Sequence, residues 1–467
     1  MLYGGVVMKK FPFLLSLMMF ILSINGFAQF IYYPNDPNFK DQTYLNNEYN
    51  HMEDIGYLEY YYYFQTHRKE ILDKYVSIKG KLPVVAIVDL DYYIQDNDLK
   101  NKVWTNEGEI ADNGKDDDGN GWVDDYKVMN FIDKKVYRTS GGRSGINETI
   151  GGMLYGTQYP PVDKFYRNPE WHGQYMALLA GAEQDNKNGW HGIVPNEVKM
   201  LLCTIGHKQV TPEGDALLWI AVRDAFNYIL DMKAKGVNIV AVNLSLGGGF
   251  DKSNFLGYDI TFGKGAFDAS LKQLDAAGIV YVVAAGNAGH NIDLQPTYPA
   301  SFVLPNGIVV GAAANYNAIR ANFSGCLPYY CGSNYGMNTV DIFTIAEKNT
   351  SMLEYGILER SDVTKDSNST SSATAITTGI FTVASLLYPE CSPVQVKRLL
   401  LDSYMDRSEL IGLTKSYDGM PHDGITKMSG EGKNALDYQI GLITKDPEKN
   451  EKNYHLNITL RKKICGK

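Results

Sequence analysis

The sequence predicts an α/β fold, in which a mainly parallel, doubly wound sheet is covered by helices on both faces. Short apolar runs rich in β-branched residues recur along the chain, each bounded by Gly, Asn or Asp. Helical patterns lie between these runs, and such alternation is typical of parallel sheets. The chain of 467 residues shows neither an internal repeat nor a long linker, so we expect one large domain.

The predicted strands are apolar on both faces, as expected for buried parallel strands. They are LPVVAIVD, KMLLCTI, NIVAVNLSL, GIVYVVAAG and GIVVGAA. The clearest helix runs from Asp215 to Lys235 and ends at Gly236, and a second begins with Ser392 as N-cap and Pro393 in the first turn. Active sites of such sheets lie beyond the carboxyl ends of the strands.

Composition indicates a globular protein, and the charge argues against a nucleic-acid binder, although a local basic patch remains possible. The hydrophobic fraction of 44% supplies a core, and the net charge of -9 argues against a nucleic-acid partner, which would require a basic face. The aromatic run from Tyr60 to Phe64 is interpreted as core material rather than as a ligand platform, because tyrosines usually line the edge of a core.

The N-terminus has the features of a secretory signal peptide. Lys9 and Lys10 precede an apolar stretch from Phe11 to Ile24, and we expect cleavage after Ala28. The apolar stretch is too short for a comfortable membrane span, and no later stretch is long enough. The mature protein is therefore predicted to be secreted, to the periplasm or the cell exterior, without stable membrane insertion. Residue 29 is Gln rather than Cys, so nothing indicates a lipid anchor.

Export permits disulfides, and the number of cysteines after cleavage is odd, so at least one stays unpaired or pairs between chains. Cys326 and Cys331, which flank the short CLPYYC loop, are the best candidate pair. The cysteines are Cys203, Cys326, Cys331, Cys391 and Cys465.

Three polar residues lie at borders of strand or helix signals in the order Asp89, His172, Ser371. Asp–His–Ser is the chain order of the subtilisin arrangement, whereas α/β-hydrolases have Ser–Asp–His. Ser371 also lacks a GxSxG context, which disfavours the hydrolase interpretation.

From about Asn35 to about Ile443 the chain resembles the subtilisin-like serine proteases, or subtilases. PNDPNFKDQTYLNN is similar to the family's mature N-terminal segment, VAIVDLDYYIQDNDL to its Asp motif, and HGQYMALLAGAEQDNKNGWHGIVPN to its His motif. VNLSLGGG resembles the substrate-binding strand, AAGNAG the oxyanion segment, and YPAS with VVGAA the two stretches after that segment. STSSATAITTGIFTVASLLYP resembles the Ser motif and its helix.

The resemblance implies a subtilisin-like catalytic domain that hydrolyses polypeptides through an acyl-enzyme on Ser371. His172 takes the proton of Ser371, and Asp89 orients the imidazole. Asn287, aided by the Ser371 backbone N–H, stabilises the oxyanion. Backbone groups of the substrate-binding strand add the peptide as a further strand, and two small residues match a wall of the primary specificity pocket. These substrate-binding residues are Ser245, Leu246, Gly247, Ala284 and Gly286.

The segment DNGKDDDGNGWVDD resembles the start of an EF-hand loop, with Gly121 at the tight turn. Lys127 stands where the bidentate Glu is usual, so the neighbouring aspartates would have to complete the oxygen shell. Similar loops are calcium sites in subtilases, so we expect a structural Ca²⁺. The alternative is a solvated acidic turn. The candidate ligands are Asp116, Asp118, Asn120, Asp124 and Asp125.

Several neighbours of the three catalytic candidates depart from the family pattern, and loss of the Thr after Asp89 removes a hydrogen bond that would help to fix its carboxylate. An alternative function is therefore a catalytically impaired protein that binds peptides or proteins in the same cleft. A calcium-binding surface module would explain the acidic loop but not VNLSLGGG or AAGNAG. The departures are Leu90 for Thr, Asp91 for Gly, Gln174 for Thr, Tyr175 for His, Ser369 for Gly and Ala375 for Pro.

We divide the chain into a signal peptide (1–28), an N-terminal segment of the mature protein (29–80), a peptidase domain (81–444) and a charged tail (445–467). The segment before the first core strand is short and similar to the family's mature N-terminus. A large inhibitory prodomain is therefore not expected.

Overall fold

The structure is a computed structural model that describes residues 33–42, 44–45, 57–90, 92, 94, 96–111, 113–131, 143–146, 172–205, 212–249, 260–313, 332–345 and 369–401. The predicted signal peptide, the C-terminal tail and the Cys326–Cys331 pair lie outside these residues.

A nine-stranded sheet forms the centre of the domain, in the order β11-β10-β8-β6-β1-β5-β3-β4-β2. From β11 to β3 all neighbours pair in parallel, and β4 is antiparallel to β3. The strands are β1 (Val84–Asp89), β2 (Trp122–Val123), β3 (Val128–Asn130), β4 (Arg143–Ile146), β5 (Lys199–Thr204), β6 (Ile239–Leu244), β8 (Val280–Ala284), β10 (Gly307–Ala313) and β11 (Ile342–Ile345). A separate ribbon pairs β7 (Gly248–Gly249) with β9 (Thr297–Tyr298).

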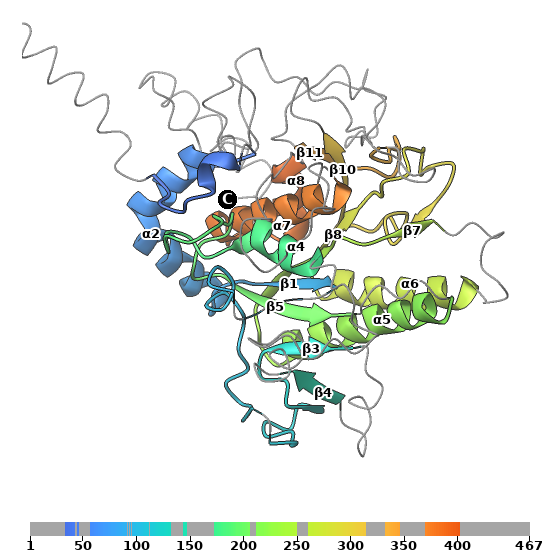
Figure 1. The fold of residues 1–467 in the computed structure, drawn as a ribbon, viewed down its shortest axis with the longest axis horizontal. Helices are drawn as coiled ribbons and strands as arrows, with labels where there is room; N and C mark the ends of the chain where they lie inside the picture. The colour runs from blue at the N-terminus through green and yellow to red at the C-terminus, as the bar shows by residue number, and fades with distance from the viewer. Residues whose placement is uncertain are drawn as a thin grey trace, which may run out of the picture.

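Helices cover both faces of the sheet, as Figure 1 shows, which confirms the predicted fold class. On one face lie α4 (His172–Gly181), α7 (Thr370–Leu387) and α8 (Pro393–Leu401), with α2 (Tyr57–Lys79) beside them. On the other face lie α5 (Pro212–Ala234) and α6 (Ile260–Ala276). A short 3-10 helix, η2 (Phe39–Asp41), precedes α2.

The five apolar runs predicted as strands form β1, β5, β6, β8 and β10, and every residue of β1 and β10 is buried. The second predicted helix is α8. Gln395 N donates to Ser392 Oγ (3.4 Å) and Ser392 N donates to Gln395 Oε1 (2.8 Å), which is the reciprocal pattern of a capping box. The prediction of Ser392 as N-cap is therefore confirmed.

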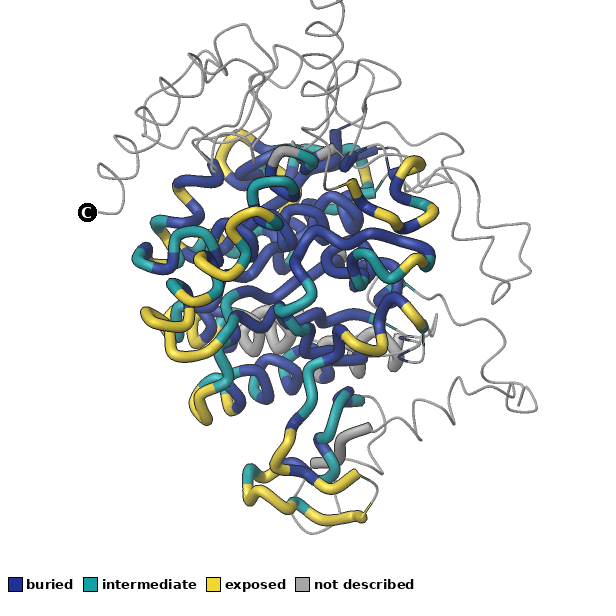
Figure 2. The backbone as a smooth tube through the Cα atoms, turned by 90° about the vertical axis from the view of Figure 1, so that its left-hand side faces the viewer, coloured by how far each residue is buried: buried dark blue, intermediate teal, exposed yellow. Residues whose placement is uncertain are grey.

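The aromatic run from Tyr60 to Phe64 lies in α2, and its residues Tyr60, Tyr61 and Phe64 are at most 3% exposed. They belong to the core on the α7 side of the sheet, so their interpretation as core material is confirmed. Figure 2 shows buried backbone throughout the interior and exposed segments on peripheral loops.

Helix α7 is long and apolar enough to cross a membrane by composition, but 94% of it is buried inside the domain. It packs against β6, β8, β10, β11 and the helices α4 and α8. In the described part of the chain this is the one helix that meets the criterion, and it is a core helix. Its buried hydroxyls donate to carbonyls one turn earlier, as in Thr374 to Thr370 O (2.6 Å) and Thr378 to Thr374 O (2.8 Å).

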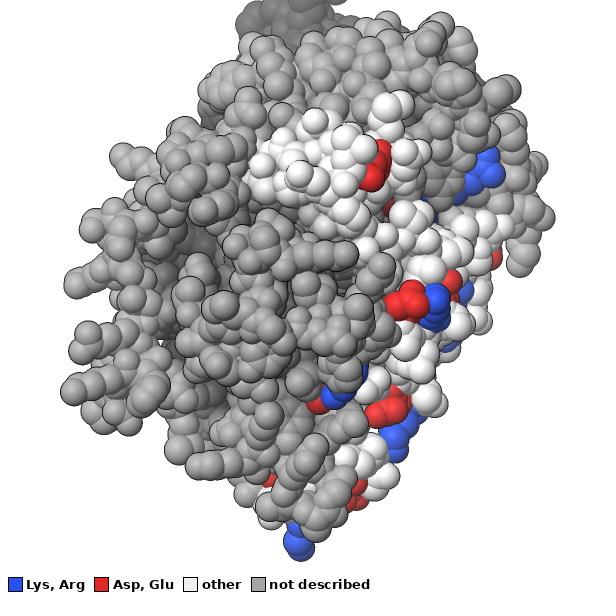
Figure 3. Space-filling view, turned by 90° about the vertical axis from the view of Figure 1, so that its right-hand side faces the viewer, with Lys and Arg blue, Asp and Glu red and all other residues white. Residues whose placement is uncertain are grey.

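Figure 3 draws one side of the molecule, and in the part of it that the described residues form, basic and acidic side chains lie next to one another in small groups.

Candidate active site

Asp89 is the last residue of β1, and β1 lies between β5, which follows it in the chain, and β6 on its other side. The direction of strand addition reverses at β1, so its carboxyl end is a topological switch point, where ligands bind in α/β sheets. The Asp89 side chain is 2% exposed there. Its Oδ1 accepts the Leu90 N–H (2.7 Å) and lies 2.6 Å from His172 Nδ1.

His172 begins α4, and its side chain is 31% exposed. The next residue, Gly173, explains how the helix comes so near to Asp89. A Cβ at Gly173 would lie 2.0 Å from the carbonyl oxygen of Leu90, and real Cβ atoms do not approach that closely. The absent side chain lets the first turn of α4 pack against the backbone that follows β1.

The second oxygen of Asp89, Oδ2, is buried and has no hydrogen-bond partner among the residues that the structure describes. The next residue is Leu90, where the sequence departs from the Thr of similar proteins. A buried carboxylate oxygen without a donor costs free energy, and it also leaves one side of the carboxylate unconstrained.

Ser371 lies in the first turn of α7 and is 7% exposed. Ser369 is the N-cap, and its hydroxyl accepts the Ser372 N–H (3.2 Å). Two hydrogen bonds join Ser371 to Ser245: its Oγ donates to the Ser245 carbonyl (3.2 Å), and its own carbonyl accepts from Ser245 Oγ (2.8 Å). The start of α7 therefore lies against the end of β6, at the same edge of the sheet as Asp89.

Asn287 follows β8, and its carboxamide orientation is fixed by the first turn of α7. Its Oδ1 accepts two hydrogen bonds, from Thr370 N (3.0 Å) and Thr370 Oγ1 (2.8 Å). Because Thr370 N can only donate, the acceptor at this position must be the amide oxygen. The donor group of the amide, Nδ2, is therefore not the atom that contacts Thr370. Thr370 Oγ1 also accepts from Gly286 N (3.2 Å), which ties the two segments together.

The predicted substrate-binding residues form two segments that approach one another. Ser245, Leu246 and Gly247 connect β6 to β7, while Ala284 ends β8 and Gly286 follows it. The sites that a Cβ would occupy on Gly247 and Gly286 lie 3.6 and 3.5 Å from Thr297 Cγ2.

Thr297 was not singled out from the sequence, although it immediately precedes the YPAS segment. It is 3% exposed and begins β9, which pairs with β7 directly after Gly247. Its side chain therefore lies between the two segments of the predicted substrate-binding region.

The acidic loop is only partly arranged as the EF-hand comparison predicts. Carboxylate oxygens of Asp118 and Asp125 gather within 4.8 Å of one another and of a third residue, Glu109, which the sequence pattern did not indicate. The pKa of Glu109 is raised to about 7 and that of Asp125 to about 6, mainly by burial and also by the neighbouring carboxylates, although hydrogen bonds to both carboxylates act in the opposite direction.

The other three predicted ligands have different contacts. Asp116 accepts backbone N–H groups of Asn120 (2.9 Å) and Gly121 (2.8 Å), and Asp124 accepts that of Gly114 (3.0 Å). The Oδ1 of Asn120 accepts the Trp122 N–H (2.7 Å). These side chains shape the loop, whereas Asp118 and Asp125 face Glu109.

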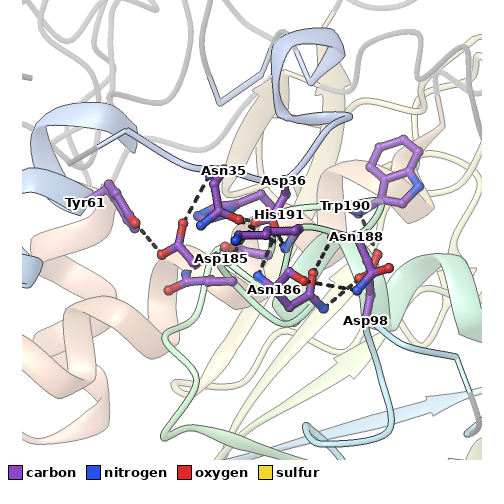
Figure 4. Close-up of polar contacts among 12 residues, drawn as sticks. Asn35, Asp36, Tyr61, Asp98, Asp185, Asn186, Asn188, Trp190 and His191 are labelled. Atoms are coloured by element: carbon purple, nitrogen blue, oxygen red, sulfur yellow. Dashed lines mark hydrogen bonds and ion pairs between the residues drawn. The ribbon is translucent and has the colours of Figure 1, made fainter. Parts of the chain in front are cut away.

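A second Asp–His pair, shown in Figure 4, joins the N-terminal segment to the loop that follows α4. Asp36 Oδ2 is 2.5 Å from His191 Nδ1, and both side chains are 0% exposed. Asp36 also accepts backbone N–H groups from Asp185, Asn186 and Lys187. This pair fastens the N-terminal segment to the body of the domain.

The two cysteines within the described residues differ. Cys203 in β5 is free and buried, and burial raises the pKa of its thiol above the usual range. Cys391 is disulfide-bonded to a cysteine outside the described residues.

The comparisons with known proteins agree with this architecture. A sequence model described as the subtilase family matches residues 80–441. No individual curated protein is matched by the sequence.

Solved structures with a similar chain trace include a protease from Pseudoalteromonas arctica, at 17% identity and a TM-score of 0.48, with 87% of this chain and 99% of that chain covered. A structure of the subtilase cytotoxin SubAB is similar at 19% identity and a TM-score of 0.47, with 82% of this chain and 95% of that chain covered. A cold adapted subtilisin-like serine proteinase is similar at 16% identity and a TM-score of 0.39, with 70% of this chain and 84% of that chain covered. Because the family model spans most of the sequence, the chain belongs to the subtilase family, a family of serine peptidases.

Proposed function

We propose that this protein is a secreted serine endopeptidase that hydrolyses polypeptides with Asp89, His172 and Ser371. The observation that carries the proposal is the Asp89 Oδ1 to His172 Nδ1 contact of 2.6 Å at the switch point of the sheet. A carboxylate at Nδ1 holds the proton on that nitrogen, so Nε2 is the basic atom of the neutral ring.

In the proposed reaction His172 Nε2 takes the proton from Ser371 Oγ as that oxygen attacks the scissile carbonyl. The acyl-enzyme then forms as the amine leaves with the same proton, and water repeats the sequence to release the acid. Asp89 stays ionised and stabilises the imidazolium. The present hydrogen bond from Ser371 Oγ to the Ser245 carbonyl (3.2 Å) must be exchanged for one to His172 when substrate binds.

The oxyanion of the tetrahedral intermediate is proposed to accept from Asn287 Nδ2 and from the Ser371 N–H at the start of α7. Thr370 supports this role because it holds Asn287 Oδ1 with two hydrogen bonds and so aims the amide nitrogen outward. A donor fixed before the reaction needs no reorganisation, and one such donor contributes roughly 10²- to 10³-fold to kcat.

The substrate is proposed to bind as an extended strand along Ser245, Leu246 and Gly247, with one side chain entering the space bounded by Ala284 and Gly286. Gly247 is exposed and lies two residues after Ser245, whose hydroxyl donates to the Ser371 carbonyl (2.8 Å), which supports a position for this strand near the reacting bond. Polypeptides are accordingly the proposed partners.

Export is proposed from the N-terminal sequence, in which Lys9 and Lys10 precede an apolar stretch ending near Ile24. N-terminal sequencing of the protein recovered outside the cytoplasm tests this. A mature chain that begins at Gln29 is expected, and a chain that keeps its first 28 residues contradicts it.

One observation favours the alternative of an impaired enzyme that binds peptides in the same cleft. Asp89 Oδ2 has no hydrogen-bond partner among the described residues. The carboxylate is therefore fixed less firmly than it would be with hydrogen bonds to both of its oxygens. Under this alternative the cleft binds peptides but turnover is very slow.

The decisive experiment compares the purified chain with Ser371→Ala and with Ser372→Ala, which alters the adjacent serine of the same helix turn. Hydrolysis of a denatured protein and of a fluorogenic peptide library is measured, together with labelling by a fluorophosphonate. We expect Ser371→Ala to abolish both, and Ser372→Ala to keep the labelling.

Labelling that survives in Ser371→Ala would rule out Ser371 as the nucleophile. If the folded wild-type chain neither cleaves nor reacts, but binds peptides from the library, the alternative of a peptide-binding protein replaces the proposal.

A further inference from the structure

The chain on both sides of Asn287 is bonded to a support segment, residues 332–336, which follows much later in the sequence. Backbone hydrogen bonds connect the two stretches, so that they form one unit whose position decides where Asn287 lies. These bonds run from Gly289 N to Gly332 O (2.9 Å), from Asn334 N to Gly286 O (2.8 Å), from Tyr335 N to His290 O (3.1 Å) and from Ile292 N to Tyr335 O (2.7 Å).

Asn334 is the residue of the support segment whose side chain bonds to the backbone around Asn287. It is 1% exposed. Its Nδ2 donates to the Ala285 carbonyl (2.8 Å), and its Oδ1 accepts from Ala288 N (3.0 Å) and His290 N (3.1 Å). These three backbone groups lie before and after Asn287 in the chain. One buried carboxamide therefore bridges the two arms of the turn that carries the proposed oxyanion donor.

Gly286 allows Asn334 to come this close. Its φ is +99°, a conformation that side chains other than glycine rarely adopt, and a Cβ there would lie 2.5 Å from Asn334 Nδ2. Real Cβ atoms do not approach that closely, so a side chain at position 286 would displace Asn334. The fit between Gly286 and Asn334 therefore belongs to the same arrangement as the three hydrogen bonds.

The support segment is itself attached to the central sheet. Ala312 N in β10 donates to Ser333 Oγ (2.9 Å), and Ser333 Oγ donates to the Asn334 carbonyl (2.9 Å). Ser333 is 0% exposed. Strand β10 pairs with β8, the strand that precedes Asn287. Asn334 is therefore fixed relative to the sheet and not only to a neighbouring loop.

We propose that Asn334 is a positioning residue that holds the Asn287 amide where it can donate to the oxyanion. The inference rests on the proposed function, since it assumes that Asn287 stabilises the tetrahedral intermediate. Asn334 acts through the backbone around Asn287, while Thr370 holds the Asn287 side-chain oxygen. A donor contributes most when it is fixed before the reaction, and a misplacement of about 1 Å can lower the rate roughly 100-fold.

The first measurement compares Asn334→Ala, which removes all three side-chain hydrogen bonds, with Asn338→Ala. Asn338 is an exposed asparagine nearby, whose side chain donates to Asp293 (3.2 Å). The kinetic constants are measured on the peptide that the wild type cleaves fastest. We expect Asn334→Ala to lower kcat roughly 100-fold with KM within about threefold, because the donor acts in the transition state. The control should stay within about threefold of wild type in both constants.

A double-mutant cycle with Asn287→Ala separates positioning from a general loss of structure. If Asn334 acts through Asn287, Asn334→Ala should cost less than about threefold once residue 287 is alanine, because no donor remains to be positioned. A merely structural role would lower kcat by the same factor in both backgrounds. Circular dichroism verifies the fold of each variant. If Asn334→Ala does not fold, Asn334→Asp, which has the same shape and keeps the acceptor oxygen, replaces it in the cycle.

Hydrogen exchange supplies a readout that does not depend on turnover. The Ala288 and His290 amides both donate to Asn334 Oδ1. They should exchange at least about tenfold faster in Asn334→Ala, because local opening no longer breaks these bonds, and at the wild-type rate in Asn338→Ala.

The outcomes distinguish this inference from the proposed function. If Asn287→Ala loses activity but Asn334→Ala does not, or if the two losses multiply in the double variant, the positioning role is wrong and the proposed function stands. If Asn287→Ala keeps full activity, the oxyanion assignment fails, and the role of Asn334 in catalysis fails with it. A folded wild-type chain that neither cleaves peptides nor reacts with the fluorophosphonate contradicts the proposed function. Unchanged exchange of the two amides in Asn334→Ala would show, even then, that Asn334 does not hold the segment.

Discussion

The molecule contains two Asp–His pairs of nearly the same length in very different surroundings. Asp89 and His172 are 2.6 Å apart at the rim of the sheet, where the His172 side chain is 31% exposed. Asp36 and His191 are 2.5 Å apart in the core, with both side chains 0% exposed. His191 Nε2 is also engaged, 2.7 Å from the Tyr57 hydroxyl.

The two carboxylates also differ in how many hydrogen bonds they accept. Asp36 accepts three backbone N–H groups in addition to the imidazole, whereas Asp89 Oδ2 has no partner within the described part of the chain. The structural pair is the better satisfied of the two. An Asp–His contact therefore does not by itself indicate catalysis, and the proposed catalytic pair is distinguished by access to its imidazole.

The largest expected effect concerns the histidine of the proposed catalytic pair. His172→Ala should lower kcat by about a million-fold, because a base that acts together with the nucleophile cannot be replaced by water. His67→Ala, at an exposed position of α2, is the control and should retain full activity. Peptide hydrolysis is the measurement, with circular dichroism to verify the fold. A His172→Ala enzyme within tenfold of wild type would refute the assignment.

The next largest expected effect is on the stability of the fold, at the buried Asp36–His191 pair. Asp36→Ala should lower the free energy of unfolding by about 3–5 kcal/mol, because it leaves His191 and three backbone N–H groups buried without their acceptor. Asp41→Ala, at an exposed acidic residue of the same segment, should change it by less than about 0.5 kcal/mol. Urea denaturation measures both. Equal losses would mean that the Asp36 contacts add little to stability.

The smallest expected effect comes from giving Asp89 Oδ2 a hydrogen-bond donor, so that both oxygens of Asp89 are paired, as those of Asp36 are. Leu90→Thr places a hydroxyl near Asp89 Oδ2, and a hydrogen bond worth about 1 kcal/mol should raise kcat/KM roughly fivefold if it forms in the transition state. Leu90→Val has the same branching without the hydroxyl and should give no gain. Equal gains in both variants would assign the effect to packing rather than to Asp89.

Local sequence patterns predicted the central strands of the sheet and the start of one helix correctly. The β-branched runs identified β1, β5, β6, β8 and β10, because a strand buried on both faces must be apolar throughout. The start of α8 followed from Ser392 and Pro393. Both kinds of inference depend only on neighbours in the chain.

Features that depend on distant contacts were missed. Glu109 lies in the plain segment TNEGEI and becomes notable only when the turn around Gly108 brings it to Asp118 and Asp125. Thr297 gains interest only because β9 pairs with β7, and the Asp36–His191 pair joins residues 155 positions apart. No periodicity or spacing rule contains that information.

The burial of α7 has a consequence for how the proposed peptidase resists cleavage by other copies of itself. Amides of a helix enclosed by the sheet and by neighbouring helices exchange with solvent only when the whole domain opens. Ser371 is carried by that helix, so another copy cannot reach the surrounding backbone through a local fluctuation. Autolysis should therefore begin at exposed segments such as residues 113–115, and the first nicks should leave the nucleophile intact.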